Sequence, residues 1–154
     1  MANKNKFHQG EYTPINPEKY KGTYPIYFRS SWEKKFSKWA DLHSSVISWG
    51  SETIFIHYYH PIKKRIARYF PDYYLIMKDK EGIITKYIVE VKPWKETIPP
   101  ERKKGKRKKT LLYESATWIV NQAKWESAKK WCKKKGLIFI IITEKQLFPH
   151  RFKK

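Results

Sequence analysis

RYFPDYYLIMKDKEGIITKYIVEVKP, the stretch at residues 68–93, decides the fold of this chain. Within it, two runs rich in apolar, β-branched and aromatic residues, at about 68–77 and 83–92, flank the polar segment KDKEG. Such runs are typical of β-strands, and Gly82 suits the positive φ that a tight turn needs. The stretch therefore predicts a β-hairpin with a short turn at 78–82.

The turn length sets which residues of the two predicted strands face each other. A three-residue loop places Asp79 opposite Ile83, and the same register places Asp72 opposite Glu90. Paired residues share a face of the sheet with Cβ atoms about 5 Å apart, and the two-residue period of a strand adds Lys92 to that face. A bulge would shift the pairing by one or two residues and still leave two carboxylates and a lysine close together.

Two neighbouring carboxylates repel each other, so one takes up a proton unless a cation lies between them. Oxygen ligands suit Mg²⁺ or Mn²⁺, and Lys92 beside such an ion could orient or deprotonate a water for in-line phosphodiester hydrolysis. The alternative is ordinary pairing of Glu90 with Lys92 on an exposed strand. Apolar neighbours on both strands favour the site, because carboxylates in apolar surroundings cost free energy to place.

Composition predicts a nucleic-acid partner. The chain has 154 residues, 34 Lys or Arg against 14 Asp or Glu, and a net charge of +20, which calls for a polyanion. With 7 Trp, 11 Tyr and 8 Phe it is too aromatic for a disordered basic protein. No membrane contact is expected, because the sequence has neither a spanning segment nor a convincing basic amphipathic helix. The single cysteine, Cys132, excludes a disulfide framework and fits a core position.

Two basic segments are expected to contact the DNA backbone without recognising its sequence. One is a flexible loop at 99–109 that contains ERKKGKRKK, and the other is a turn that follows Pro61. The expected DNA-binding residues are Lys63, Lys64, Arg65, Arg102, Lys103, Lys104, Lys106, Arg107, Lys108 and Lys109.

The sequence before the hairpin predicts an arm, a helix and a strand. Residues 1–28 carry several Pro and Gly and predict an extended N-terminal arm with little regular structure, followed by a single domain at 29–154. TIFIHYY at 53–59 predicts a strand. A helix is indicated by apolar residues at helical spacing, namely Trp32, Phe36, Trp39, Ala40 and His43.

The sequence after the hairpin predicts a pair of helices and a last strand. The helices are expected at 110–120 and 121–135, with a break at Asn121 and a C-terminal cap at Gly136. LIFIII at 137–142 predicts a strand buried on both faces. The resulting order is αβββαβ, which favours an α/β fold in which helices flank a mixed sheet.

These motifs resemble a known nuclease pattern. Pro71-Asp72 and Glu90-Val91-Lys92, after a helix that bears Glu33, are similar to the PD-(D/E)xK superfamily with its restriction-endonuclease-like αβββαβ core. Longer segments recur in the head completion proteins of T-even-like tailed phages, and this similarity covers about residues 14–147. The segments are 27–33, 49–53, 68–72 and 89–93, followed by Thr117-Trp118, Asn121, Lys124-Trp125 and Thr143-Glu144.

The resemblance implies a metal-dependent DNA endonuclease or DNA-end-processing protein that acts in phage head completion during virion assembly. It implies Mg²⁺ or Mn²⁺ as cofactor, DNA as substrate, and phage head or portal proteins as partners, in the host cytoplasm or in the virion. It also implies that Asp72 and Glu90 bind the metal with the Val91 carbonyl as a further ligand, that Lys92 is the catalytic lysine, and that Glu33 is an additional catalytic acid.

Glu33 also fits a structural role. Ser30 to Glu33 matches the S-x-x-E capping box, in which Glu33 would bond back to the Ser30 amide, and the two roles are compatible. Glu52 ranks below Glu33 as a further acid of the site. Two other functions stay open: a non-catalytic DNA-binding plug at the head portal, and a resolvase of branched DNA.

Overall fold

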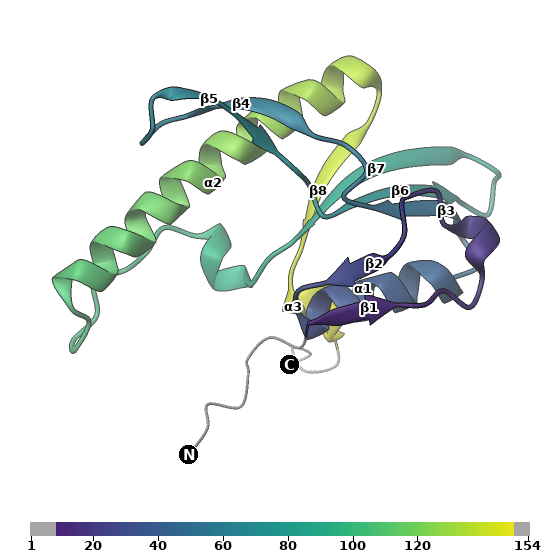
Figure 1. Ribbon diagram of the computed structural model, residues 1–154, viewed down its shortest axis with the longest axis horizontal. Helices are drawn as coiled ribbons and strands as arrows, with labels where there is room; N and C mark the ends of the chain where they lie inside the picture. The colour runs from purple at the N-terminus through teal and green to yellow at the C-terminus, as the bar shows by residue number, and fades with distance from the viewer. Residues whose placement is uncertain (1–8, 150–154) are drawn as a thin grey trace.

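A four-stranded mixed sheet forms the centre of the protein in the computed structural model, which describes residues 9–149 (Figure 1). β7 runs antiparallel to β6 and parallel to β8, and β3 pairs antiparallel with the other edge of β6. In order across the sheet the strands are β3 (Val46–Ser51), β6 (Tyr73–Lys78), β7 (Ile84–Val91) and β8 (Ile138–Ile142).

The β6–β7 hairpin has the predicted register. The pairing runs from Tyr73 opposite Val89 to Lys78 opposite Ile84. The Asp79 amide donates to the Ile83 carbonyl at 3.0 Å, which closes the three-residue loop. The next position beyond Tyr73 and Val89 brings Asp72 and Glu90 to the same end of the hairpin.

Helices cover both faces of the sheet, as the αβββαβ order predicted. Helix α1 (Ser31–Leu42) precedes β3, and helix α2 (Lys108–Lys135) precedes β8. Alternate residues of β8 separate the two faces, because Ile140 and Ile142 join the cluster under α1, whereas Phe139 and Ile141 join the cluster under α2. A short helix, α3 (Glu144–Leu147), follows β8. Within residues 9–149 no helix is long and apolar enough to cross a membrane.

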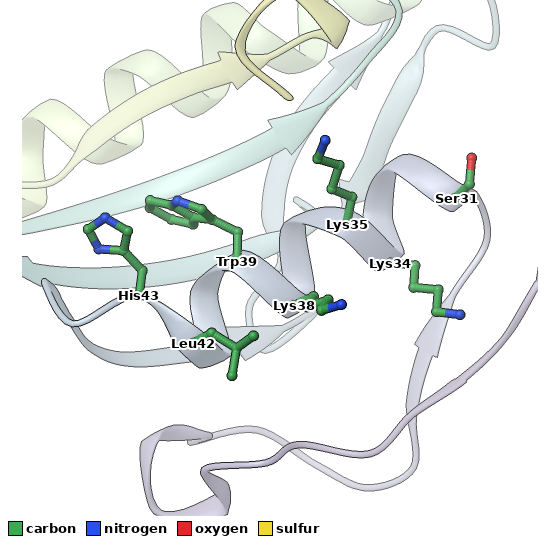
Figure 2. A pocket seen from close by; sticks show the side chains of 7 residues that line it. All are labelled: Ser31, Lys34, Lys35, Lys38, Trp39, Leu42 and His43. Atoms are coloured by element: carbon green, nitrogen blue, oxygen red, sulfur yellow. The ribbon is translucent and has the colours of Figure 1, made fainter. Parts of the chain in front are cut away.

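Helix α1 buries a narrower face than its apolar spacing predicted. Phe36 and Ala40 are buried against the sheet, and Trp32 packs beside them. Trp39 and His43 lie outside this core, with their rings 4.9 Å apart. They line an open hollow of about 620 Å³ along the outer side of α1 (Figure 2). This hollow shares no residue with the carboxylate site described below.

The first strands differ from the prediction. The first strand of the sheet is β3, whereas the expected strand at 53–59 belongs to a separate hairpin of β4 (Ile56–His60) and β5 (Arg65–Tyr69) inserted between β3 and β6. The expected strand at 68–77 is divided between β5 and β6. Pro71 lies in the gap, where it has no amide hydrogen to donate to a strand pair.

The C-terminal half also departs from the prediction in two places. α2 is one helix of 28 residues, and Asn121 is buried within it and does not break it, because tertiary packing outweighs weak helix propensity. β8 is an edge strand with half-exposed side chains, since only β7 flanks it. Gly136 caps α2 with a φ of 70°, and Cys132 is buried, both as predicted.

The N-terminal segment is folded onto the domain and is not an arm with little regular structure. Residues 1–8 lie outside the described part of the chain. Strand β1 (Gly10–Tyr12) pairs antiparallel with β2 (Ile26–Phe28), and a 3-10 turn, η1 (Pro17–Lys19), lies between them. Tyr20 and Ile26 are buried in the cluster that contains Trp49 of β3, so residues 10–28 contribute to the core.

A buried carboxylate ties this segment to α1. Asp41 is fully buried and accepts hydrogen bonds from the Tyr12 hydroxyl at 2.6 Å and from the amides of Ile15 at 2.7 Å and Asn16 at 2.9 Å. Burial alone would raise the pKa of Asp41, but these hydrogen bonds outweigh it and hold the pKa below its ordinary value. Asp41 is therefore a charged anchor between the segment and the helix.

We expect Asp41→Ala to lower the free energy of unfolding by about 3 kcal/mol, because three donors lose a buried, charged acceptor. Urea unfolding at pH 7 measures the loss, with the exposed Glu11→Ala as control. Because the folded pKa is depressed, the contribution of Asp41 is complete above pH about 4 and disappears as the pH falls through the lowered pKa. A variant as stable as the parent at pH 7 would contradict the conclusion that Asp41 stabilises the attachment of the N-terminal segment to α1.

Candidate active site

Two carboxylates meet where the β6–β7 hairpin opens. Asp72 lies directly before β6, and Glu90 lies in the last part of β7, 7% exposed. Asp72 Oδ2 accepts a hydrogen bond of 2.7 Å from the Val91 amide, so the backbone of β7 fixes its side chain. The two residues that the register placed opposite each other are thus held together.

The electrostatics of the pair favour a positive partner. Burial and the charges of Glu90 and Glu33 raise the pKa of Asp72 well above its ordinary value. Burial also raises the pKa of Glu90. A bound cation would lower the pKa of both carboxyl groups, because opposite charge stabilises the ionised form.

Tyr69, the last residue of β5, holds Glu90 in place. Its hydroxyl donates to Glu90 Oε2 at 2.6 Å, and both groups are buried. Burial and the Glu90 charge raise the pKa of Tyr69, so the phenol stays a neutral donor. In the sequence Tyr69 is one of the apolar neighbours of Asp72 and part of the resembling segment 68–72, but nothing in a linear pattern predicts that the inserted hairpin returns to the site.

Lys92 lies at the same end of β7. Its ammonium is 3.9 Å from Glu90 Oε1, and its amide donates to the Ile142 carbonyl of β8 at 2.9 Å. The backbone at Lys92 is therefore fixed by the neighbouring parallel strand, and the side chain is on the predicted face beside Glu90.

A second lysine, Lys124, approaches from α2. Its ammonium lies 5.7 Å from the ring centre of Tyr69 and 5.9 Å from that of Tyr58. Burial and the charge of Lys92 lower the pKa of Lys124, whereas Glu90 and Asp72 act in the opposite sense. The sequence contained Lys124 only within a segment of family resemblance, since a lysine in a basic helix carries no distinctive signal.

Glu33 caps α1 and also acts on the site. Its amide donates to Ser30 Oγ at 3.1 Å, as predicted, but its carboxylate accepts from the Arg29 amide at 2.7 Å and not from the Ser30 amide. The Tyr73 hydroxyl donates to the Glu33 carbonyl at 2.9 Å, which fixes the first turn of α1 over β6. Burial raises the pKa of Glu33, and its charge raises that of Asp72. Glu52 forms an ion pair with Arg29.

The donor set suits a hard divalent cation that keeps part of its water. Asp72 Oδ1 accepts no hydrogen bond from the described residues, and Glu90 Oε1 lies 3.9 Å from the ammonium of Lys92. Among those residues no three acidic, histidine or cysteine side chains form a complete metal cage. Two carboxylates, a backbone carbonyl and water are a typical Mg²⁺ set. The Val91 carbonyl as a ligand stays a prediction.

The predicted DNA-binding residues lie on the α2 side of the sheet, in two places (Figure 1). Lys63, Lys64 and Arg65 are exposed at the β4–β5 turn. The loop that precedes α2 ends at Arg107, so Lys108 and Lys109 lie in the first turn of the helix and not in a loop. Lys106 is bonded to Glu114 at 2.8 Å. The remaining basic residues of the loop are exposed, namely Arg102, Lys103, Lys104 and Arg107.

Comparison with known proteins points to nucleases. Residues 43–144 match the family model of the TnsA-like endonuclease N terminal domain. The chain is also 39% identical over 150 residues to the head completion nuclease of Enterobacteria phage T4, an alignment that covers 95% of this chain and 97% of the relative. No solved structure gave a significant match. The family segment contains Asp72, Glu90 and Lys92, whereas Glu33 precedes it.

We expect Asp72→Asn to stabilise the metal-free protein by about 1 kcal/mol, because it removes a charge that burial and two acids oppose. A raised folded pKa means that the parent loses stability as the pH rises from about 4 through that pKa, so the gain should be present at pH 7. Thermal unfolding in EDTA tests this, with Glu126→Gln as the exposed control. Equal or lower stability of the variant would contradict the conclusion that the Asp72 charge destabilises the metal-free protein.

We expect Tyr69→Phe to weaken divalent cation binding by about tenfold, as loss of a group that orients a ligand usually does. The Tyr69 hydrogen bond lowers the pKa of Glu90, so its removal should also shift the onset of binding to higher pH. Calorimetric titration with Mn²⁺ between pH 6 and 8 measures both, and Tyr74→Phe is the matched control. Unchanged affinity and pH profile would show that Tyr69 only packs.

Proposed function

Because this chain belongs to the TnsA-like endonuclease N-terminal family and is a homologue of the phage T4 head completion nuclease, we propose that it hydrolyses DNA with a divalent cation during phage head completion. The observation that carries the proposal is the Asp72–Glu90 pair, two carboxyl groups with raised pKa beside Lys92 at one end of the sheet. Two buried acids with raised pKa values lower the stability of the fold, and such groups cluster at functional sites.

The cofactor of the proposed reaction is Mg²⁺ or Mn²⁺, the site is of the PD-(D/E)xK type, and Asp72 and Glu90 hold the ion with the Val91 carbonyl. When bound, such an ion polarises the phosphate and lowers the pKa of a bound water. The donor chemistry of the two carboxylates supports this choice, since oxygen ligands suit hard cations.

The side chains around the pair have separable tasks. Lys92 positions the attacking water and places a positive charge next to the reacting phosphate. Tyr69 keeps Glu90 oriented through its 2.6 Å hydrogen bond. Glu33, with its raised pKa and its fixed backbone, exchanges a proton at the edge of the site.

DNA binds through its phosphates. The net charge of +20 and the exposed basic residues at 63–65, 102–104 and 107–109 give a large, sequence-independent attraction. The protein acts in the host cytoplasm during assembly, or in the virion, next to phage head or portal proteins. The name of the phage T4 relative supports this setting.

A non-catalytic DNA-binding plug at the head portal is the second candidate. The large positive charge favours it, but the plug leaves the acidic pair without a role. A resolvase of branched DNA has no specific support in residues 9–149.

The proposal is tested by plasmid nicking in Mg²⁺, Mn²⁺ and EDTA. We expect cleavage by the parent protein with either metal, none in EDTA, and a loss of at least about 100-fold in Asp72→Ala and Lys92→Ala, because each removes charge from the reacting centre. Glu126→Ala, an exposed acid on α2, is the control and should cleave normally. All variants should still bind duplex DNA in a gel-shift assay. Tight, salt-sensitive binding without cleavage by the parent would favour the plug.

A further inference from the structure

A pocket beside the active site contains polar groups that the fold leaves without partners. It has a volume of about 510 Å³ and is lined by residues of α2 and of the segment that leaves the site through η2 (Trp94–Thr97), which begins two residues after Lys92. One helical turn of α2 separates Asn121, which lines the pocket, from Lys124 at the carboxylates. The Asn121 end of the pocket is therefore the end nearest to the carboxylates along α2.

Asn121 is the first unpartnered group. It is 6% exposed, lines the pocket, and its side-chain amide makes no hydrogen bond with the described residues. Among the described residues the enclosed side-chain atoms without a partner are the indole nitrogens of Trp49, Trp118 and Trp125, so the Asn121 amide opens into the pocket.

Trp118 is the second unpartnered group. It also lines the pocket, and its indole Nε1 is buried without an acceptor in the described part of the chain. Asn121 presents an amide donor and an amide acceptor, and Trp118 contributes its ring and an enclosed indole N–H. The apolar part of the wall is formed by Ile98, Pro99, Pro100 and Tyr113, and the polar part by Thr117 and the charged residues Lys95, Glu96, Glu101, Lys103, Lys106 and Glu114. Flat apolar surfaces with a few convergent polar groups suit a planar heterocycle.

The wall of the pocket is held closed by a polar link. Lys106 donates to the Glu101 carbonyl at 2.7 Å and to the Glu114 carboxylate at 2.8 Å, which joins the loop to α2. The pocket is therefore built into the fold and is not a gap beside a loose loop.

We propose that this pocket binds an unpaired nucleobase of the DNA substrate. This rests on the proposed function, since it takes the bound base to belong to the DNA that is cleaved. The Asn121 amide offers a donor and an acceptor side by side, which match the N6 and N7 edge of adenine. Pro99, Pro100 and Trp118 offer apolar surface for the ring. The substrate class is thus DNA with a single-stranded end or a displaced nucleotide.

The test measures binding in EDTA, so it does not depend on cleavage. Three probes share one duplex, which is blunt, or carries a three-nucleotide adenine extension, or carries the same extension without bases. We expect about tenfold tighter binding of the adenine extension than of the abasic one by fluorescence anisotropy, the usual size of one stacked and bonded base. Equal affinity for the two extensions would overturn the proposal, whatever the nicking assay shows.

Two variants locate the effect. Asn121→Leu should fold, because it replaces a buried unpartnered amide with an apolar group of similar size, and it should lose the preference for adenine while keeping its affinity for the blunt duplex. Trp118→Phe keeps the ring, loses the Nε1 donor and should lose part of the preference. Thermal unfolding checks both folds. A preference that survives both substitutions would overturn the pocket as its source. Competition by free dAMP in the absence of any extension preference would overturn the assignment to DNA.

Discussion

The rest of the structure depends on one strand pairing. The β6–β7 register brings Asp72 and Glu90 together, although two buried acids repel each other. The fold tolerates this because the Val91 amide and the Tyr69 hydroxyl each hold one of the two carboxylates. Helix α1 on one side and α2 on the other then add Glu33 and Lys124 to the same centre.

Features that depend on residues close together in the sequence could be predicted, whereas those that depend on the packing of distant elements could not. The hairpin register depends on a three-residue loop, so Asp72, Glu90 and Lys92 were predictable together, as was the cap at Gly136. Tyr69 and Lys124 were not recognised, because their roles depend on where β5 and α2 pack. The predicted edges of the elements were wrong for local reasons. Pro71 divides a run that is rich in aromatic and apolar residues, and β3 contains Ser and Gly, which carry a weak strand signal.

The inserted β4–β5 hairpin has two roles: it buries apolar surface against α2, and it positions a residue of the carboxylate site. It packs on α2 through Ile56 and Tyr58, and it ends at Tyr69, so the same contact that buries apolar surface also positions Glu90. Stability and the geometry of the carboxylates are therefore linked through one short hairpin. The N-terminal segment is joined to both ends of α1, because Asp41 ties it to the last turn and the Arg29 amide that follows β2 donates to the Glu33 carboxylate in the first turn.

The parallel pairing of β7 with β8 sets the order in which the centre can form. β8 follows the 28 residues of α2, yet its Ile142 carbonyl fixes the Lys92 backbone. Parallel strand pairs need a long connection and form slowly, because a large loop must close, at a cost in entropy, before the strands make stabilising contacts. During synthesis, the β6–β7 hairpin therefore leaves the ribosome well before β8, the strand that fixes the Lys92 backbone. A nascent chain that ends before residue 138 holds the two carboxylates without that lock, so the complete constellation exists only once β8 has been made.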